Sequence, residues 1–345
     1  MNPRERWQAV LDRHQPDRMP MDYWATNEAT EALLLYLDVT DVRQMYERLN
    51  IDRVISVGPA YVGPAIPEGE DVFGCRHEVV DYGTGTYSEC LHHPLAAYET
   101  AEAIESDYIW PSPDWYDYTG IADQVRGWED YPIRGGGSEP FLTYKKLRGQ
   151  EQAFIDLIEH PDVVTYCLDK LFDLAYNNSI RLYEAIPGQI IISYVAEDLG
   201  SQESLMCSLA HIRHYLLPRM KRMIDLAHDA GAYVFFHSDG AVRDVLPDMI
   251  SLGIDVLNPI QWRCAGMERE ELKRDFGDDV IFHGAVDNQY TLAFGSVEEV
   301  RTEVEENIEI LGDGGGYILA PCHNIQAVSP PENIVAMYET GYELA

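Results

Sequence analysis

Positive charge is scarce in this sequence. The 345 residues contain 25 lysines and arginines against 59 aspartates and glutamates, a formal net charge of −34 at pH 7. A surface of this sign repels nucleic-acid phosphates and anionic membranes. The composition therefore argues against both as partners, and we interpret the acidic surface mainly as a solvated one that keeps the protein in solution.

Paired cysteines, long apolar runs and a dinucleotide-binding glycine motif are also missing. The six cysteines stand singly with no CxxC spacing, which argues against a disulfide framework or a structural zinc finger. No run approaches the roughly 18 apolar residues of a membrane helix, and the opening MNPRERW has no signal-peptide pattern, so we expect a cytoplasmic protein. No GxGxxG follows the first expected strand, which disfavours a Rossmann-type sheet.

After residue 185, short β-branched or aromatic runs alternate with amphipathic stretches. The expected strands are 189–195, 232–236, 256–259, 280–284 and 317–321, and the expected helices are 210–230, 242–252, 268–276 and 297–311. Glycines 231, 253, 277 and 312 follow these helices, as helix-ending residues do. This alternation predicts the second half of an α/β fold, a (β/α)₈ TIM barrel.

The N-terminal part must supply the other strands, and 18–24 and 53–57 are the candidates for the first two. Asn2 and Pro3 are predicted to begin a helix. Residues 63 to about 135 are interpreted as helical and strand insertions near the barrel mouth, including a strand pair within HEVVDYGTGTYSECLHHP, and helices are expected over 149–159 and 161–184. The glycine runs 135–137 and 314–316 are interpreted as turns. We expect one domain over residues 1–345.

Polar residues follow each of the five later strands. In a parallel barrel the active site is built at the carboxyl ends of the strands, so these residues should face one pocket. The runs are YVAEDLG (194–200), HSDG (237–240), NPIQ (258–261), HGAVD (283–287) and CHNIQ (322–326). Five such strand ends together predict an enzyme active site.

His237, Asp239 and Cys322 are candidate ligands of a catalytic zinc ion. His237 and Asp239 are two residues apart on an extended segment and therefore point the same way, and Cys322 follows the last strand. Three protein ligands with an open fourth position are what a catalytic zinc needs. The alternative is that each has an ordinary role, the histidine in hydrogen bonding and the cysteine in the core. Likewise Glu197, Asp198 and Asp287 could cap helices.

Several segments resemble the uroporphyrinogen decarboxylase superfamily, and within it the barrel methyltransferases that work with corrinoid proteins. They are PRERWQAVLDRHQPDRMPMDYW near the start, AEDLGSQ (196–202), LLPRMKRMIDLAHDAGAYVFFHSDG (216–240), DVLNPIQ (255–261), FHGAVDNQYTLAFGSVEEV (282–300) and GGGYILAPCHNIQAVSPPENIVAMYE (314–339). The resemblance covers most of the chain and implies a (β/α)₈ barrel.

Two departures from the family pattern bear on function. The arginine-bearing RQAGR-like segment of true uroporphyrinogen decarboxylases is replaced by DYWATNEATEALL, which disfavours decarboxylation of a tetrapyrrole. In the corrinoid-linked members an HxCG motif and a later cysteine bind zinc; His237 and Cys322 match, but Asp239 replaces the middle cysteine. A carboxylate leaves zinc more Lewis acidic, which suits an oxygen leaving group, and also suits a harder ion such as Mn²⁺.

The resemblance implies O-demethylation: transfer of a methyl group from a small O-methyl substrate to a corrinoid (cobalamin) carried by a partner protein, with an N- or S-methyl substrate as the less favoured alternative. Zn²⁺ would be held by His237, Asp239 and Cys322, with Glu197 as a further candidate. The expected catalytic residues are Glu197, Asp198, His283, Asp287 and His323, with His283 or His323 as proton donor. The expected substrate-binding residues are Tyr194, Asn258, Gln261, Trp262, Tyr290 and Asn324.

Two alternatives remain at this point. One is a metal-free decarboxylase or other lyase on the same barrel, using Asp239, Asp287 and the histidines for acid and base catalysis. The other is a non-catalytic barrel that binds a corrinoid or a partner, which the loss of the middle cysteine would favour. The resemblance is compatible with a monomer or a homodimer.

Overall fold

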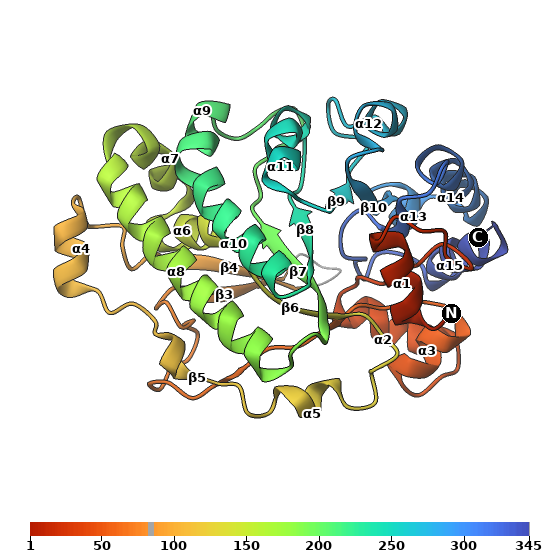
Figure 1. Cartoon of the computed structure of the whole chain (residues 1–345), viewed down its shortest axis with the longest axis horizontal. Coiled ribbons are helices and arrows are strands. Elements are labelled where there is room, and N and C mark those ends of the chain that lie inside the picture. Colours follow the sequence, from red (N-terminus) through yellow and green to blue (C-terminus); the bar gives the residue numbers. More distant parts are fainter. Residues whose placement is uncertain (82–85, 345) are drawn as a thin grey trace.

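A curled parallel sheet forms the centre of the computed structural model, which describes residues 1–81 and 86–344 (Figure 1). Seven strands pair side by side in the order β1, β6, β7, β8, β9, β10, β11, every pair parallel. Their bounds are β1 (Ile55–Ser56), β6 (Ile133–Ser138), β7 (Ile190–Ala196), β8 (Tyr233–His237), β9 (Val256–Ile260), β10 (Ile281–Val286) and β11 (Tyr317–Pro321).

The segment around Met21 occupies the eighth position of the barrel. Met21 forms a parallel bridge with Leu319 of β11, and its carbonyl accepts a hydrogen bond from Asp52 N (2.7 Å), just before β1. The barrel prediction is thus confirmed. The strand expected over 18–24 is wrong in extent, because this segment forms only single bridges at Met21 and Ala25.

Helices cover the outside of the sheet, and helix α1 (Pro3–Leu11) packs against the side chains inside the barrel. The outer helices are α8 (Pro161–Ala185), α9 (Leu209–His211) continuing through a π-helical turn (Ile212–Leu216) into α10 (Leu217–Asp229), α11 (Leu246–Leu252) after a 3₁₀ turn (Arg243–Val245), α12 (Arg269–Phe276), α13 (Thr291–Phe294), α14 (Val297–Leu311) and α15 (Pro331–Leu344). Helix α1 places Trp7 against the apolar side chains inside the barrel, including Ile192, Phe235 and Ile318. The barrel interior is therefore a packed core below the site.

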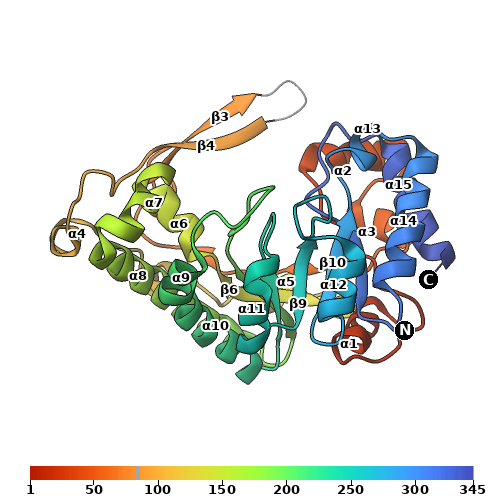
Figure 2. The same cartoon turned by 90° about the horizontal axis from the view of Figure 1, so that it is seen from above.

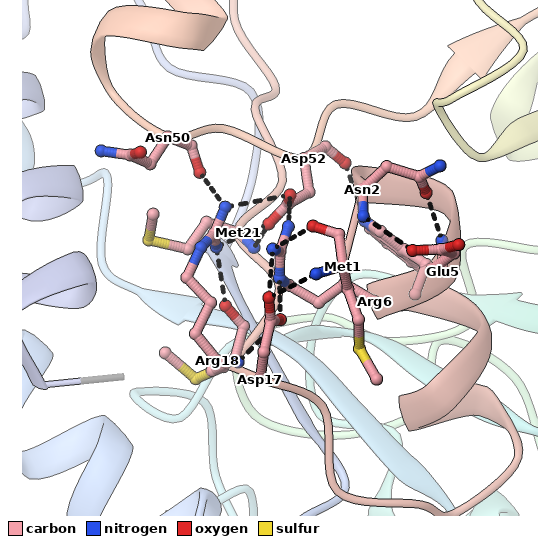
Figure 3. A network of polar contacts seen from close by, with 11 residues as sticks. Met1, Asn2, Glu5, Arg6, Asp17, Arg18, Met21, Asn50 and Asp52 are labelled. Atoms are coloured by element: carbon pink, nitrogen blue, oxygen red, sulfur yellow. Dashed lines mark hydrogen bonds and ion pairs between the residues drawn. The ribbon is translucent and has the colours of Figure 1, made fainter.

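A network of buried charges anchors α1 to the barrel (Figure 3). The Asp52 carboxylate accepts hydrogen bonds from Arg6 Nη1 (2.5 Å), from Arg18 Nη1 (2.7 Å) and from Met21 N (3.1 Å). Arg6 also donates to Asp17 (2.7 and 3.0 Å). The Asn2 side chain accepts from Glu5 N, and the Glu5 carboxylate accepts from Asn2 N, so the predicted helix start is confirmed as a capping box.

The remaining elements precede β7. They are α2 (Asn27–Tyr36), α3 (Val42–Arg48), β2 (Ala60–Tyr61) paired with β5 (Tyr116–Asp117), β3 (Arg76–Asp81) paired with β4 (Thr86–His92), α4 (Ala101–Asp107), a 3₁₀ turn (Pro113–Trp115), α5 (Ile121–Val125), α6 (Pro140–Arg148) and α7 (Gln150–Glu159). The β3–β4 hairpin confirms the predicted strand pair and projects from the body (Figure 2). Its predicted turn falls on residues 82–85, which lie outside the described residues.

One glycine interpretation needs correction, because the run 135–137 is part of strand β6 and not a turn. Glycine is required there, since a Cβ at Gly137 (φ +103°) would lie 1.9 Å from the Tyr194 carbonyl oxygen of β7. The glycines predicted to end helices do so: Gly253, Gly277 and Gly312 are C-cap residues, and Gly231 follows the C-cap Ala230. Only Gly231 and Gly253 of these four have the left-handed conformation. The run 314–316 is a turn, as predicted. No helix in the described part of the chain is long and apolar enough to span a membrane.

Candidate active site

A cavity of about 450 Å³ opens at the carboxyl ends of β1, β6, β7 and β8, where a barrel enzyme carries its site. Its polar and aromatic lining is Trp24, Ser56, Arg134, Ser138, Glu139, Tyr194 and His237. A second cavity of about 380 Å³ shares Ser138 and Glu139 with it and continues toward α8. The space is large enough for a small organic molecule.

Asp198, His237 and Asp239 converge at one edge of this cavity. Each offers one ligand atom, and these atoms all lie within 4.8 Å of one another. Asp198 comes from the loop after β7, and His237 ends β8, the next strand, so the two loops meet. Asp239 N donates to Asp198 Oδ1 (3.2 Å), which fixes the two loops together. The group fits a divalent cation, with one imidazole and two carboxylate donors.

A chain of hydrogen bonds orients His237 from behind. Its Nδ1 lies 2.7 Å from Asn258 Oδ1, and Asn258 Nδ2 lies 2.6 Å from His283 Nδ1. His283 Nε2 in turn lies 3.2 Å from the buried Asp22 carboxylate. The network assigns the protons: His283 donates to Asp22, Asn258 donates to His283, and His237 donates to Asn258. With its Nδ1–H donating to Asn258, His237 directs Nε2 toward Asp198, and this is the nitrogen that would bind a cation.

Cys322 is not part of this cluster, in contrast to the predicted ligand set. It is buried, and its thiol donates to Asn288 Oδ1 (3.0 Å). Burial raises the pKa of this thiol well above its usual range. Asp198 takes the third position in the group that the structure brings together.

The Asp239 carboxylate is braced by two neighbours. Gln261 Nε2 donates to Asp239 Oδ1 (2.8 Å), while Gln261 Oε1 accepts from Gly240 N (2.7 Å). His323 Nε2 lies 3.5 Å from Asp239 Oδ2, and its ring stacks on Trp24. Burial raises the pKa of Asp239, an effect that His323 opposes. Gln261 therefore positions the metal-binding loop, and His323, half exposed, remains near the cavity.

Three of the expected catalytic residues lie outside the lining of this cavity. Glu197 is buried and accepts hydrogen bonds from Phe141 N (2.8 and 2.9 Å), so it caps the start of α6. Asp287 pairs with Arg263 (2.9 Å) and accepts from the backbone before α13. His283 is fully buried behind Asn258. The capping interpretation thus fits Glu197 and Asp287, and none of the three is among the residues that line the cavity.

Of the expected substrate-binding residues, one lines this cavity and the others lie outside its lining. Tyr194 lines the cavity, and its ring stacks nearly parallel to that of His237 (centroids 6.2 Å apart, 8° between planes). Asn258 and Gln261 do not line the cavity; they form hydrogen bonds with His237 and Asp239, respectively. Trp262 and Tyr290 line a different cavity of about 520 Å³ beside α14. Asn324 interacts with Gln326 (3.1 Å) and Asn288 (3.1 Å).

Sequence reasoning missed four residues that shape the site. Trp24, Arg134 and Glu139 line the cavity, and Asp22 ends the hydrogen-bond chain. Burial raises the pKa of Glu139, and the nearby Asp198 raises it further. Arg134 and Glu139 flank the glycine run that was interpreted as a turn. Strand β6 begins at Ile133 and ends at Ser138, just before Glu139, but its three glycines, which are depleted in strands, obscured it.

Comparisons with known proteins agree with this architecture. A family model described as uroporphyrinogen decarboxylase (URO-D) matches residues 80–344. The chain is 26% identical to a uroporphyrinogen decarboxylase of Neisseria gonorrhoeae, over 62% of this chain and 55% of the relative. It is 24% identical to the methylcobamide:CoM methyltransferase MtaA of Methanosarcina barkeri, over 60% of this chain and 57% of the relative. The chain thus spans little more than half the length of these curated relatives.

One solved structure shares the fold over its whole length. A methyltransferase from Methanosarcina mazei superposes with a TM-score of 0.71 at 20% identity, covering 100% of this chain and 99% of the other. At that identity the likeness establishes the barrel fold and its insertions, and the chemistry must be argued from the site.

Proposed function

The chain belongs to the uroporphyrinogen decarboxylase family, and we propose that it is a metal-dependent methyltransferase that moves a methyl group from a small O-methyl substrate to a corrinoid carried by a partner protein. The observation that carries the proposal is the convergence of Asp198, His237 and Asp239 at the cavity edge. The similarity to a methylcobamide:CoM methyltransferase supports the choice of a corrinoid partner.

The chemical type of the metal ligands determines whether the site favours an oxygen leaving group or a thiol nucleophile. Two carboxylates and one imidazole make a hard, oxygen-rich site for Zn²⁺ or Mn²⁺, without a thiolate ligand. A cation held there supplies a Lewis acid that stabilises negative charge developing on a leaving oxygen. Activation of a thiol coenzyme, which a more electron-rich sulfur-ligated zinc favours, fits this donor set less well.

The remaining residues orient and protonate the substrate. Trp24 and Tyr194 provide aromatic walls. The oxygen–methyl bond breaks with its electron pair left on oxygen, and the reduced cobalt of the partner's corrinoid supplies the pair for the new bond. His323, beside Asp239, is the proton donor to the product oxygen.

The test combines metal analysis with a methyl-transfer assay on the full chain. The protein supplied with Zn²⁺ or Mn²⁺ should bind about one ion per chain, and methoxylated compounds should then convert reduced cobalamin to methylcobalamin, followed by absorbance. His237→Ala should lose both properties. His14→Ala is the matched control, because His14 is exposed and forms no ion pair with the described residues. A parent protein that binds neither ion would overturn the mechanism.

Decarboxylation is the second candidate, favoured by the relatives named uroporphyrinogen decarboxylase. The carboxylates of Asp198, Asp239 and Glu139 at the cavity oppose it, because they repel a substrate with many carboxylates. Release of CO₂ from a carboxylated tetrapyrrole by metal-free protein, with no methylcobalamin formed, would favour decarboxylation over methyl transfer.

A further inference from the structure

Arg134 is a cation inside the active-site cavity with no acidic partner. It forms no ion pair with any residue of 1–81 or 86–344, and its guanidinium carbon lies 4.3 Å from the centroid of the Tyr194 ring. The buried arginines of the described chain are paired with carboxylates: Arg6 with Asp52, Arg148 with Asp156 (2.6 Å) and Arg269 with Glu306 (2.9 Å). In a chain with 59 acidic residues, this arginine lacks a carboxylate although three acids surround the same cavity.

Tyr194 links Arg134 to the metal-binding cluster. Strand β7, which carries Tyr194, lies between β6 with Arg134 and β8 with His237. The Tyr194 ring lies 4.3 Å from the Arg134 guanidinium carbon and 6.2 Å from the His237 ring, so both groups pack against the same aromatic side chain. One substituted six-membered ring is long enough to reach two groups that contact the same tyrosine ring.

A second polar group in the cavity also lacks a partner. Ser138 Oγ is buried and has no hydrogen-bond partner in the described part of the chain, although Ser138 lines both cavities. A buried hydroxyl without a partner costs free energy. Trp24 and Tyr194 contribute aromatic rings to the cavity lining. The cavity thus has a cation, aromatic sides and a metal-binding group at its edge.

We propose that the substrate is a methoxylated aromatic carboxylic acid with a single ring, whose carboxylate binds Arg134 while its methoxy group reaches Asp198, His237 and Asp239. The planar guanidinium can donate two parallel hydrogen bonds to a carboxylate, the geometry in which arginine binds this group most strongly. The positive charge of Arg134 also offsets the repulsion that the three nearby acids exert on a bound carboxylate. The position of the methyl group rests on the proposed function; the anion-binding role of Arg134 does not.

Calorimetry with three probes tests the anion site: benzoate, 4-methoxybenzoate and the neutral 4-methoxybenzamide. Arg134→Gln should lower the affinity for both carboxylates about tenfold to a hundredfold and leave the affinity for the amide unchanged. Arg126→Gln is the matched control, because Arg126 is exposed (77% of its side chain) and pairs only with Asp123. No binding of either carboxylate to the parent protein, or unchanged binding to Arg134→Gln, overturns the proposal.

Two further variants keep the outcomes distinct. If Arg134→Gln does not fold, Arg134→Lys replaces it, since lysine keeps the charge but loses the paired hydrogen bonds; full carboxylate affinity in this variant would overturn the proposal. His237→Ala should still bind benzoate while losing methyl transfer. Benzoate binding that depends on Arg134, without methyl transfer from 4-methoxybenzoate in the metal-loaded parent, would contradict the proposed function while supporting the anion site.

Discussion

Asn258 Oδ1 lies 2.7 Å from His237 Nδ1, and this contact determines which nitrogen of His237 faces the cavity. The amide group of Asn258 can fill this role because its Nδ2 is directed to His283, which is itself held by Asp22. A hydrogen-bonded neighbour that fixes the ring of a metal-binding histidine commonly changes metal affinity by about 10- to 100-fold. Three residues from three other segments of the chain thus act together on the ligand atom of His237.

Asn258→Ala should therefore lower zinc affinity by about 10- to 100-fold without removing a ligand. Asn258→Asp keeps an acceptor oxygen for His237 Nδ1 and should recover part of the affinity. Competition with a chelating dye measures both, with circular dichroism to check the fold. Asn177→Ala, at an exposed position on α8, is the control. Equal zinc affinity in parent and Asn258→Ala would show that the hydrogen-bond chain has no influence on the metal.

Asp198→Asn and Cys322→Ser distinguish the structural ligand set from the one expected from sequence. Because Asp198 lies with His237 and Asp239 whereas the Cys322 thiol donates to Asn288, only Asp198→Asn should lose bound metal. We expect its metal affinity to fall by about tenfold or more, and that of Cys322→Ser to stay at the parent value. The metal content of each variant after dialysis measures this difference. Loss of metal from Cys322→Ser would show that the Cys322 thiolate is a metal ligand after all.

Arg6→Met should destabilise the protein without reducing metal binding. Asp52 is fully buried, and removal of Arg6 leaves its charge partly uncompensated, at a cost of about 3 kcal/mol. Thermal unfolding with metal analysis on the same samples separates stability from site integrity. The exposed pair of Arg126 with Asp123 gives the control, since Arg126→Met should cost at most about 1 kcal/mol. Similar losses in both variants would mean that the buried network adds no special stability.

His228 should make stability depend on pH in the neutral range. The hydrogen bond to Asp255 (2.9 Å) raises the pKa of His228 in the folded protein above its unfolded value. A raised pKa contributes stability that is fully present below the unfolded pKa, near 6.5, and lost as pH rises through the folded pKa. The melting temperature of the parent should therefore exceed that of His228→Gln most at about pH 6, with the gap closing toward about pH 9.

The matched control is His14→Gln, since His14 is exposed and has no ion pair among the described residues. Its melting temperature should follow that of the parent across the same range. A gap for His228→Gln that stays constant or widens as pH rises would show that the ion pair with Asp255 does not stabilise the folded state.

Local sequence pattern was enough to predict the second half of the barrel. Strands β7 to β11 and helix α14 lie where periodicity places them, because each is a continuous apolar or amphipathic run bounded by polar or glycine residues. The local sequence pattern failed to predict β6. Glycines are required at 135–137 because side chains there would collide with β7 and α8, and these contacts cannot be read from neighbouring residues in the sequence. The segment around Met21 is a barrel strand only through its bridge to Leu319, almost 300 residues away.

The sequence alone determined which residues follow the strands and therefore that His237, Asp239 and Asp198 reach the same end of the barrel. Only the tertiary structure decided what each does there. Side chains at strand ends can turn into the cavity or into neighbouring loops, and the partners that choose between these directions come from distant segments. Glu197 accepts from the backbone of Phe141 at a helix start, the Cys322 thiol donates to Asn288, and Arg134 lies over the Tyr194 ring in the cavity.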